Sequence, residues 1–189
     1  MTVIPAPTYD VTIDGGRVLA WDGLLSPADQ DQLHRVLQNS SYARTEIARP
    51  DTADYRHWAV DIDLAAATRM PIYAPALAAI ESRFAGKRMR LYRCYVNVAH
   101  FGDMLYMHED CAPGAGELTG LWYLCDRWDP EWGGETLFFD ASKDVRAAIQ
   151  PRPGRFALFS GEITHVGRPP NRICHASRFT LAMKFELVP

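Results

Sequence analysis

The chain has 189 residues, of which 48% are hydrophobic and 23% charged, and its formal net charge is -3. This length and balance are typical of one globular domain, 1–189, with a full hydrophobic core. A slightly acidic chain without a basic block is unsuited to nucleic acid, because binding there depends on clustered Lys and Arg. No apolar run reaches the ~20 residues of a membrane helix, which argues against a membrane protein.

The N-terminal sequence and the cysteines indicate a cytoplasmic protein. The first residues have neither the basic nor the apolar region of a secretory signal peptide. None of the four cysteines belongs to a Cys-x-x-Cys pair, and no disulfide framework is evident. Reduced thiols in the cytoplasm are the simplest interpretation.

Residues 1–85 are expected to form an N-terminal arm and supporting helices. The polar, Pro- and Gly-containing start of the chain predicts an arm or a short edge strand. Ser26 then fits an N-cap and Pro27 the first helical position, so we expect a helix that ends near Asn39. A second helix is expected over 74–84.

Two further features complete this part of the chain. The polar segment 43–63 predicts a loop or a hairpin, and residues 43–58, rich in Arg and aromatic side chains, suit a lid over a site. The helix-side histidine His34 is expected to be exposed.

Residues 86–189 are expected to form a jelly-roll core, because short strands alternate with Gly, Pro and Asp turns. Helices first and strands afterwards favour a mainly β fold, a β-jelly roll supported by N-terminal helices. The expected strands span 88–98, 104–110, 118–125, 135–140, 145–150, 155–160, 164–167 and 177–187.

Three residues could bind a metal. On a strand, His108 and Asp110 point to the same side and Glu109 to the other, and His165 would come from a distant strand. Two imidazoles and one carboxylate leave the opposite coordination positions open, which suits a non-haem Fe(II) oxygenase. Zinc accepts the same ligands, and a lone His-x-Asp is also common as ordinary surface or core structure.

Further motifs follow in a set order and carry a family resemblance. They are Tyr95, Leu121-Trp122-Tyr123-Leu124, Trp128 to Trp132 with Gly133-Gly134-Glu135, Pro153-Gly154-Arg155, and Arg178-Phe179-Thr180-Leu181. Together with the three metal-ligand candidates, this series resembles the 2-oxoglutarate- and Fe(II)-dependent oxygenases, in particular the prolyl-4-hydroxylase-like branch. The resemblance covers about residues 90–187.

The resemblance implies a distorted double-stranded β-helix, a cupin-like jelly roll, with catalytic Fe(II) held by His108, Asp110 and His165. It also implies that 2-oxoglutarate and O2 are cosubstrates, and it allows stimulation by ascorbate. Halogenases of this superfamily lack the carboxylate ligand, so the presence of Asp110 favours hydroxylation or a related oxidation.

The resemblance also assigns residues to 2-oxoglutarate. Arg178 would bind its far carboxylate, because a guanidinium offers two parallel donors and stays charged. Tyr123 occupies the family position that assists there, and Tyr95 a position near the iron-side end. Arg168 and Arg172 are alternatives to Arg178, although Arg172 follows a Pro-rich loop sequence.

The substrate is expected to be a small molecule, such as an amino acid or a biosynthetic intermediate, because the chain lacks a recognisable peptide-binding module. A prolyl or peptidyl hydroxylase remains an alternative, as does a cupin-like metal-binding module without enzymatic activity. Lys184 shares the strand face of Arg178 and could meet a substrate carboxylate. The other candidates for the substrate side are Thr136, Asn97, Tyr106, Trp58 and Arg56.

Overall fold

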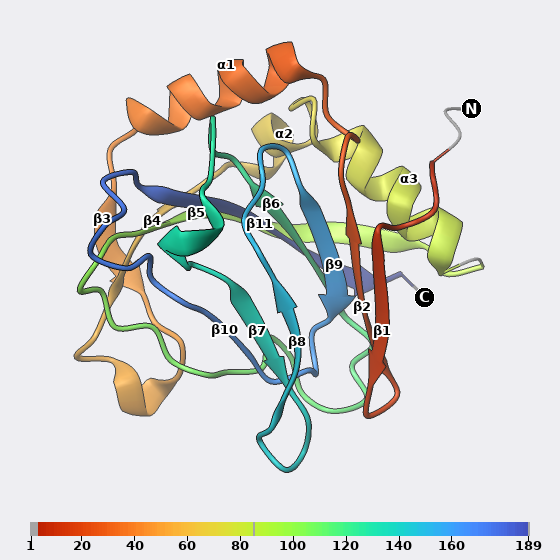
Figure 1. Ribbon diagram of the computed structural model, residues 1–189. Helices are drawn as coiled ribbons and strands as arrows, with labels where there is room; N and C mark the ends of the chain where they lie inside the picture. The colour runs from red at the N-terminus through yellow and green to blue at the C-terminus, as the bar shows by residue number, and fades with distance from the viewer. Residues whose placement is uncertain (1–3, 85, 189) are drawn as a thin grey trace.

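Residues 4–84 and 86–188 are described by a computed structural model, in which two antiparallel sheets are stacked and helices cover the outer face of the larger one (Figure 1). The strands are β1 (Tyr9–Ile13), β2 (Gly16–Trp21), β3 (Ala43–Glu46), β4 (His57–Asp61), β5 (Met89–Ala99), β6 (Leu118–Tyr123), β7 (Thr136–Phe139), β8 (Val145–Ile149), β9 (Phe156–Ser160), β10 (His165–Gly167) and β11 (Arg178–Leu187). The larger sheet has the order β1-β2-β9-β6-β11-β5-β4-β3, and the smaller sheet has the order β10-β7-β8. The mainly β, jelly-roll prediction is confirmed.

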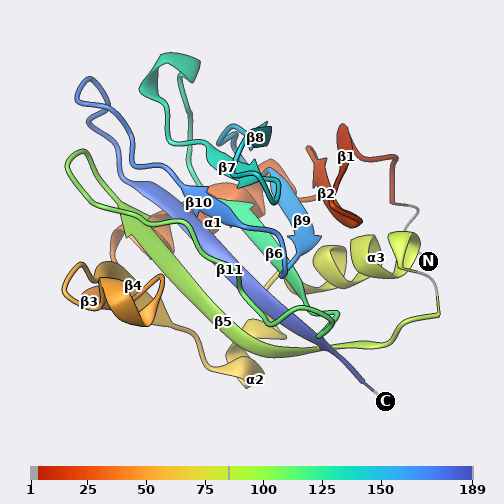
Figure 2. The same ribbon diagram turned by 90° about the horizontal axis from the view of Figure 1, so that it is seen from below.

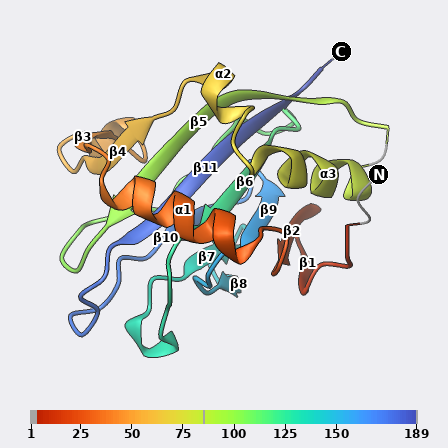
Figure 3. The same cartoon turned by 90° about the horizontal axis from the view of Figure 1, so that it is seen from above.

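The longer helices begin and end close to the predicted residues. They are α1 (Pro27–Gln38) and α3 (Tyr73–Arg83), with the short α2 (Leu64–Ala67) and the 3-10 turns η1 (Pro50–Thr52) and η2 (Pro130–Trp132). The Ser26 hydroxyl accepts the Asp29 backbone N–H at 3.1 Å, which confirms the predicted N-cap. Seen from above, α1 and α3 lie across the larger sheet (Figure 3).

Two hydrophobic cores hold the layers together. The first lies between the helices and the larger sheet, where Leu33 of α1 and Ile80 of α3 belong to the same buried cluster as Met183 of β11. The second lies between the two sheets and includes Phe138 of β7 and Phe159 of β9. Figure 2 shows the smaller sheet over the opposite face of the larger one. Side chains on that inner face of β5, β6 and β11 are therefore enclosed between the sheets.

The N-terminal part contributes more than an arm and helices. β1 and β2 form one edge of the larger sheet, and β4 and β3 form the other. β4 pairs with β5 in the register Ala59↔Asn97, so the hairpin alternative for segment 43–63 is the correct one. This register brings one face of β4 to the space between the sheets.

Two structural expectations were wrong. Residues 104–110 form no strand; the only pairing described there is a single bridge between His108 and His165. His34 is buried rather than exposed, because its Nδ1 hydrogen bonds with the Leu124 carbonyl at 2.9 Å. Among the helices in the described part of the chain, none has the length and apolar character to cross a bilayer.

Candidate functional site

His108, Asp110 and His165 converge at the end of the space between the sheets. One ligand atom from each lies within 4.8 Å of the others, and no other such group occurs in the described ranges. Asp110 Oδ1 is 3.5 Å from His108 Nε2, and Asp110 Oδ2 is 3.6 Å from His165 Nε2. Glu109 points away and accepts the Thr164 hydroxyl at 2.5 Å. The side-chain directions predicted for 108–110 therefore hold even though the segment is not a strand.

Backbone contacts fix both imidazoles. The His108 N–H donates to the His165 carbonyl at 3.0 Å, and the His165 N–H donates back at 2.9 Å. Each ring also bonds through Nδ1 to a nearby carbonyl, His108 to Tyr106 at 3.0 Å and His165 to Ile163 at 2.9 Å. With Nδ1–H donating to a carbonyl, Nε2 keeps its lone pair for a metal. Burial lowers the pKa of His165 to about 4, so this ring is neutral at neutral pH.

Asp110 is buried beside a lysine. Lys184 of β11 forms an ion pair with Asp110 Oδ2 and donates to the Thr119 hydroxyl at 3.1 Å. Thr119 in turn donates to the same Oδ2 at 2.5 Å. Burial raises the pKa of the Asp110 carboxyl, but the surrounding imidazoles and the Lys184 ammonium outweigh this and hold that pKa well below its usual range. The carboxylate is therefore ionised with Oδ2 fixed, and Oδ1 is the less engaged oxygen.

Arg178 is a buried cation without a carboxylate partner. Its side chain is in the same cavity wall as His108, His165 and Lys184, and only 4% of the residue is exposed. Its Nε donates to the Gly134 carbonyl at 2.6 Å and its Nη2 to the Thr136 hydroxyl at 3.0 Å. Within residues 4–84 and 86–188, no Asp or Glu forms an ion pair with it. A buried charge with only neutral partners is costly, so this position is suited to an anionic ligand.

The alternatives to Arg178 are on the surface. Arg168 and Arg172 are both exposed and do not line the cavity. Gly167 makes room for the buried guanidinium, because a Cβ there would lie 3.3 Å from both of its terminal nitrogens. The geometry thus separates one enclosed arginine from two solvent-facing ones.

The two candidate tyrosines differ in their relation to the cavity. Tyr95 lines it, with the Arg93 guanidinium 4.1 Å from its ring centre. Tyr123 lies behind the wall: its hydroxyl donates to Thr136 at 2.7 Å, and its ring centre is 5.5 Å from the Arg178 guanidinium. Tyr123 therefore does not line the cavity itself, but it contacts Thr136 and Arg178, which do.

The structure places only some of the substrate-side candidates in the cavity wall. Asn97, Thr136, Tyr106 and Lys184 line the cavity, but the amine of Lys184 is already engaged by Asp110 and Thr119. Trp58 packs on the helix-side core, because alternate residues of β4 point to opposite faces.

Arg56 is exposed and bonds to the Ala53 carbonyl at 3.3 Å, so it too is absent from the cavity wall. Sequence reasoning missed two polar residues of the wall, His57 and Thr119. Alternate residues of β4 point to opposite faces, so His57 faces the cavity and Trp58 does not. This difference can be used only when the register of β4 against β5 is known.

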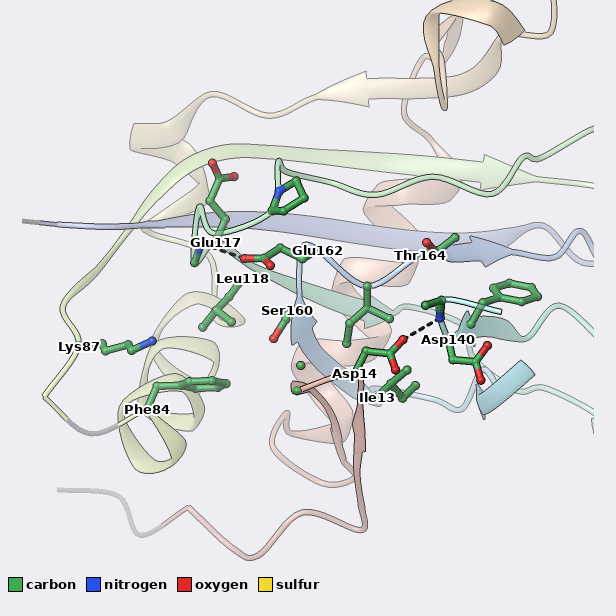
Figure 4. Close-up of a pocket in the computed structure, with 17 residues that line it drawn as sticks. Ile13, Asp14, Phe84, Lys87, Glu117, Leu118, Asp140, Ser160, Glu162 and Thr164 are labelled. Atoms are coloured by element: carbon green, nitrogen blue, oxygen red, sulfur yellow. Dashed lines mark hydrogen bonds between the residues drawn. The ribbon is translucent and has the colours of Figure 1, made fainter. Parts of the chain in front are cut away.

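A second and larger hollow lies on the outside, where the β1–β2 turn approaches the end of α3 (Figure 4). It has a volume of about 610 Å³ and shares no residue with the cavity. Its acids serve as loop anchors: Asp14 accepts the Ala141 N–H at 2.7 Å, and Glu162 accepts the Gly116 N–H at 3.3 Å. These two carboxylates therefore hold loops in place.

Comparison with known proteins gives one family match. The model of the 2OG-Fe(II) oxygenase superfamily matches residues 92–185, which include all three metal-ligand candidates and Arg178. A comparison with curated protein sequences finds no match.

Several solved structures are similar in fold. A prolyl hydroxylase from Trichoplax adhaerens, in complex with a hypoxia inducible factor peptide fragment, has a TM-score of 0.68 at 16% identity, covering 89% of this chain and 83% of that one. HygX from Streptomyces hygroscopicus, with nickel and 2-oxoglutarate bound, has a TM-score of 0.66 at 14% identity, covering 89% and 82%. SnoN, an α-ketoglutarate-dependent epimerase from nogalamycin biosynthesis, has a TM-score of 0.65 at 14% identity, covering 89% and 76%.

Proposed function

Because the chain belongs to the 2OG-Fe(II) oxygenase superfamily, whose members are enzymes that use Fe(II) and 2-oxoglutarate, we propose that it hydroxylates an unactivated C–H bond of a small molecule. His108, Asp110 and His165 would hold the iron. Their donors fit such an ion, since both Nε2 atoms are free and Asp110 Oδ1 is the less engaged carboxylate oxygen.

The single observation that carries 2-oxoglutarate use is the buried, unpaired guanidinium of Arg178 in the wall of the same cavity. A carboxylate can accept parallel bonds from a guanidinium, and these are strong in an enclosed site. Thr136 and Tyr123 support the role, because they fix Arg178 from behind through the Thr136 hydroxyl.

When bound together, iron and 2-oxoglutarate supply the oxidative chemistry, in which O2 and 2-oxoglutarate yield succinate and CO2 and one oxygen atom enters a C–H bond of the substrate. The protein contributes position and exclusion of water. Asp110 stays ionised beside Lys184, His165 stays neutral, and Arg178 orients the cosubstrate by its far carboxylate. O2 is the second proposed cosubstrate, and we expect ascorbate to stimulate turnover.

A small polar substrate is supported by the polar side chains that line the cavity, because such pockets use a few well-placed polar groups for orientation. Purified protein should be offered panels of amino acids and of peptides, with release of succinate measured for each. Succinate release with peptides alone would favour the peptidyl hydroxylase alternative and contradict our preference.

The enzymatic role itself is tested by anaerobic addition of Fe(II) and 2-oxoglutarate. We expect a weak metal-to-ligand charge-transfer band that is absent in His108→Ala. Arg178→Ala should weaken 2-oxoglutarate binding by roughly a hundredfold, about 3 kcal/mol for a charge-assisted pair, and leave metal binding intact. Arg172→Ala, on the surface, is the matched control. Tight zinc binding with no band and no turnover would instead indicate a cupin-like binding module.

A further inference from the structure

Two residues of the cavity wall each carry a buried polar atom without a hydrogen-bond partner. Among the described residues, four buried side-chain nitrogen and oxygen atoms have no partner, and two of these are His57 Nε2 and Asn97 Oδ1. Both residues line the cavity that His108 and His165 also line. An unpaired buried polar atom typically costs about 1–3 kcal/mol, so two in one cavity need an explanation.

The register of the sheet brings the two side chains together. Asn97 of β5 is opposite Ala59 of β4, and His57 lies two residues further along β4 on the same face. Such diagonal neighbours on an antiparallel pair are about 7–8 Å apart or less, within reach of one small group between them.

Both unpartnered atoms can accept a hydrogen bond. Asn97 Oδ1 is a carbonyl oxygen. Burial, together with the nearby His108, lowers the pKa of His57, so its ring is neutral at neutral pH. In the tautomer with its proton on Nδ1, His57 Nε2 carries a lone pair, and this nitrogen has no partner in the structure.

The two cationic side chains of the wall already have partners or a proposed ligand. The Lys184 ammonium is bonded to Asp110 and Thr119, and the Arg178 guanidinium serves the proposed cosubstrate position. The unpartnered atoms of His57 and Asn97 would therefore be satisfied by a ligand that donates hydrogen bonds, and not by an anion.

We propose that Asn97 and His57 recognise a nitrogen group of the substrate that carries at least two hydrogens, as in a primary amine or a primary amide. This inference rests on the proposed function, because it assigns the substrate side of that site. It makes Asn97 and His57 specificity-determining residues and predicts that a substrate without such a group binds poorly.

The test uses the Fe(II)- and 2-oxoglutarate-loaded protein with a panel of L-amino acids and their primary amides. Each is paired with a fully N-methylated counterpart, which keeps the shape and removes the donor hydrogens. Succinate release and the shift in melting temperature on ligand addition are both recorded. We expect at least one unmethylated compound to be favoured by about tenfold or more over its counterpart, the equivalent of one to two hydrogen bonds.

Variants of Asn97 and His57 test whether their acceptor atoms are responsible for the preference. Asn97→Leu and His57→Leu should each lose about tenfold in apparent affinity for that compound, whereas Asn97→Asp, which keeps the acceptor oxygen, should retain binding. His175→Leu, at an exposed histidine, is the matched control. Without ligand, Asn97→Leu should melt about 2–6 °C higher, since it removes an unpaired buried acceptor.

Several outcomes would overturn the inference: equal response to methylated and unmethylated compounds, no response to any amine or amide, or loss of binding in Asn97→Asp as complete as in Asn97→Leu. These outcomes are distinct from failure of the proposed function, which would appear as a wild-type protein with no charge-transfer band and no 2-oxoglutarate binding. The melting temperature of unliganded Asn97→Leu remains informative in either case, because it needs neither iron nor cosubstrate.

Discussion

The ion pair of Lys184 with Asp110 predicts how the metal-free protein responds to loss of the lysine. The Asp110 side chain is 6% exposed, and among residues 4–84 and 86–188 Lys184 is the one lysine or arginine that forms an ion pair with it. Lys184→Met removes this partner, while Thr119 can still donate to Oδ2. Removing one member of a buried pair costs about 3–5 kcal/mol. For a chain of this size, that loss lowers the melting temperature by roughly 10 °C.

The assay is urea unfolding of chelator-treated protein, repeated with a divalent metal ion. A metal bound to Asp110 replaces the lost positive charge, so Lys184→Met should regain most of its stability with metal present. By linkage, metal binding to the variant is then tighter than to wild type. Lys87→Met, at an exposed lysine, should change stability by less than about 0.5 kcal/mol.

Two outcomes would refute this reasoning. One is equal stability of Lys184→Met and wild type in chelator. The other is additivity in the double variant Asp110→Asn with Lys184→Met, which should be less destabilised than the sum of its single changes because the two groups interact directly.

Three further predictions concern the same cavity. Gly167→Ala should weaken 2-oxoglutarate binding by about tenfold, because its Cβ would press on the Arg178 guanidinium. Isothermal titration calorimetry measures this affinity, and unchanged binding would show that the guanidinium has room to move. The stability of the metal-free protein should fall as pH drops from about 6.5 toward 4, because His165 becomes protonated in the unfolded chain over this range but not in the folded chain. An equal pH dependence of unfolding in His165→Leu would contradict the lowered pKa of His165. Thr136→Val should raise the Kd for 2-oxoglutarate and leave metal affinity unchanged, since Thr136 joins Arg178 to Tyr123; a change confined to metal titrations would argue against that connection.

Local signals predicted much of the fold. The N-cap at Ser26 and the Gly and Pro turns around the later strands depend on neighbouring residues, so the elements could be predicted from the sequence. The grouping of His108, Asp110 and His165 followed from the order of motifs along the chain, and the structure brings their donors together.

Long-range register could not be predicted in the same way. The face of β4 depends on a bulge between Arg44 and Glu46 and on pairing with β5, and neither leaves a clear local pattern. The sequence alone therefore favours Trp58 and Arg56, whereas His57 is the residue of this segment that lines the cavity. Lys184 was expected to await a substrate anion, but its nearest acid, Asp110, comes from a part of the chain 74 residues earlier.

The paired backbone hydrogen bonds between His108 and His165 link the metal-ligand candidates to the assembly of the whole fold. His165 belongs to the smaller sheet, whereas Asp110 is held by Thr119 and Lys184 of the larger one. A metal bound by all three would therefore act as a clamp across the interface between the sheets. Release of metal during unfolding would report the moment at which the sheets separate, and chelation would loosen that interface before it affects either sheet alone.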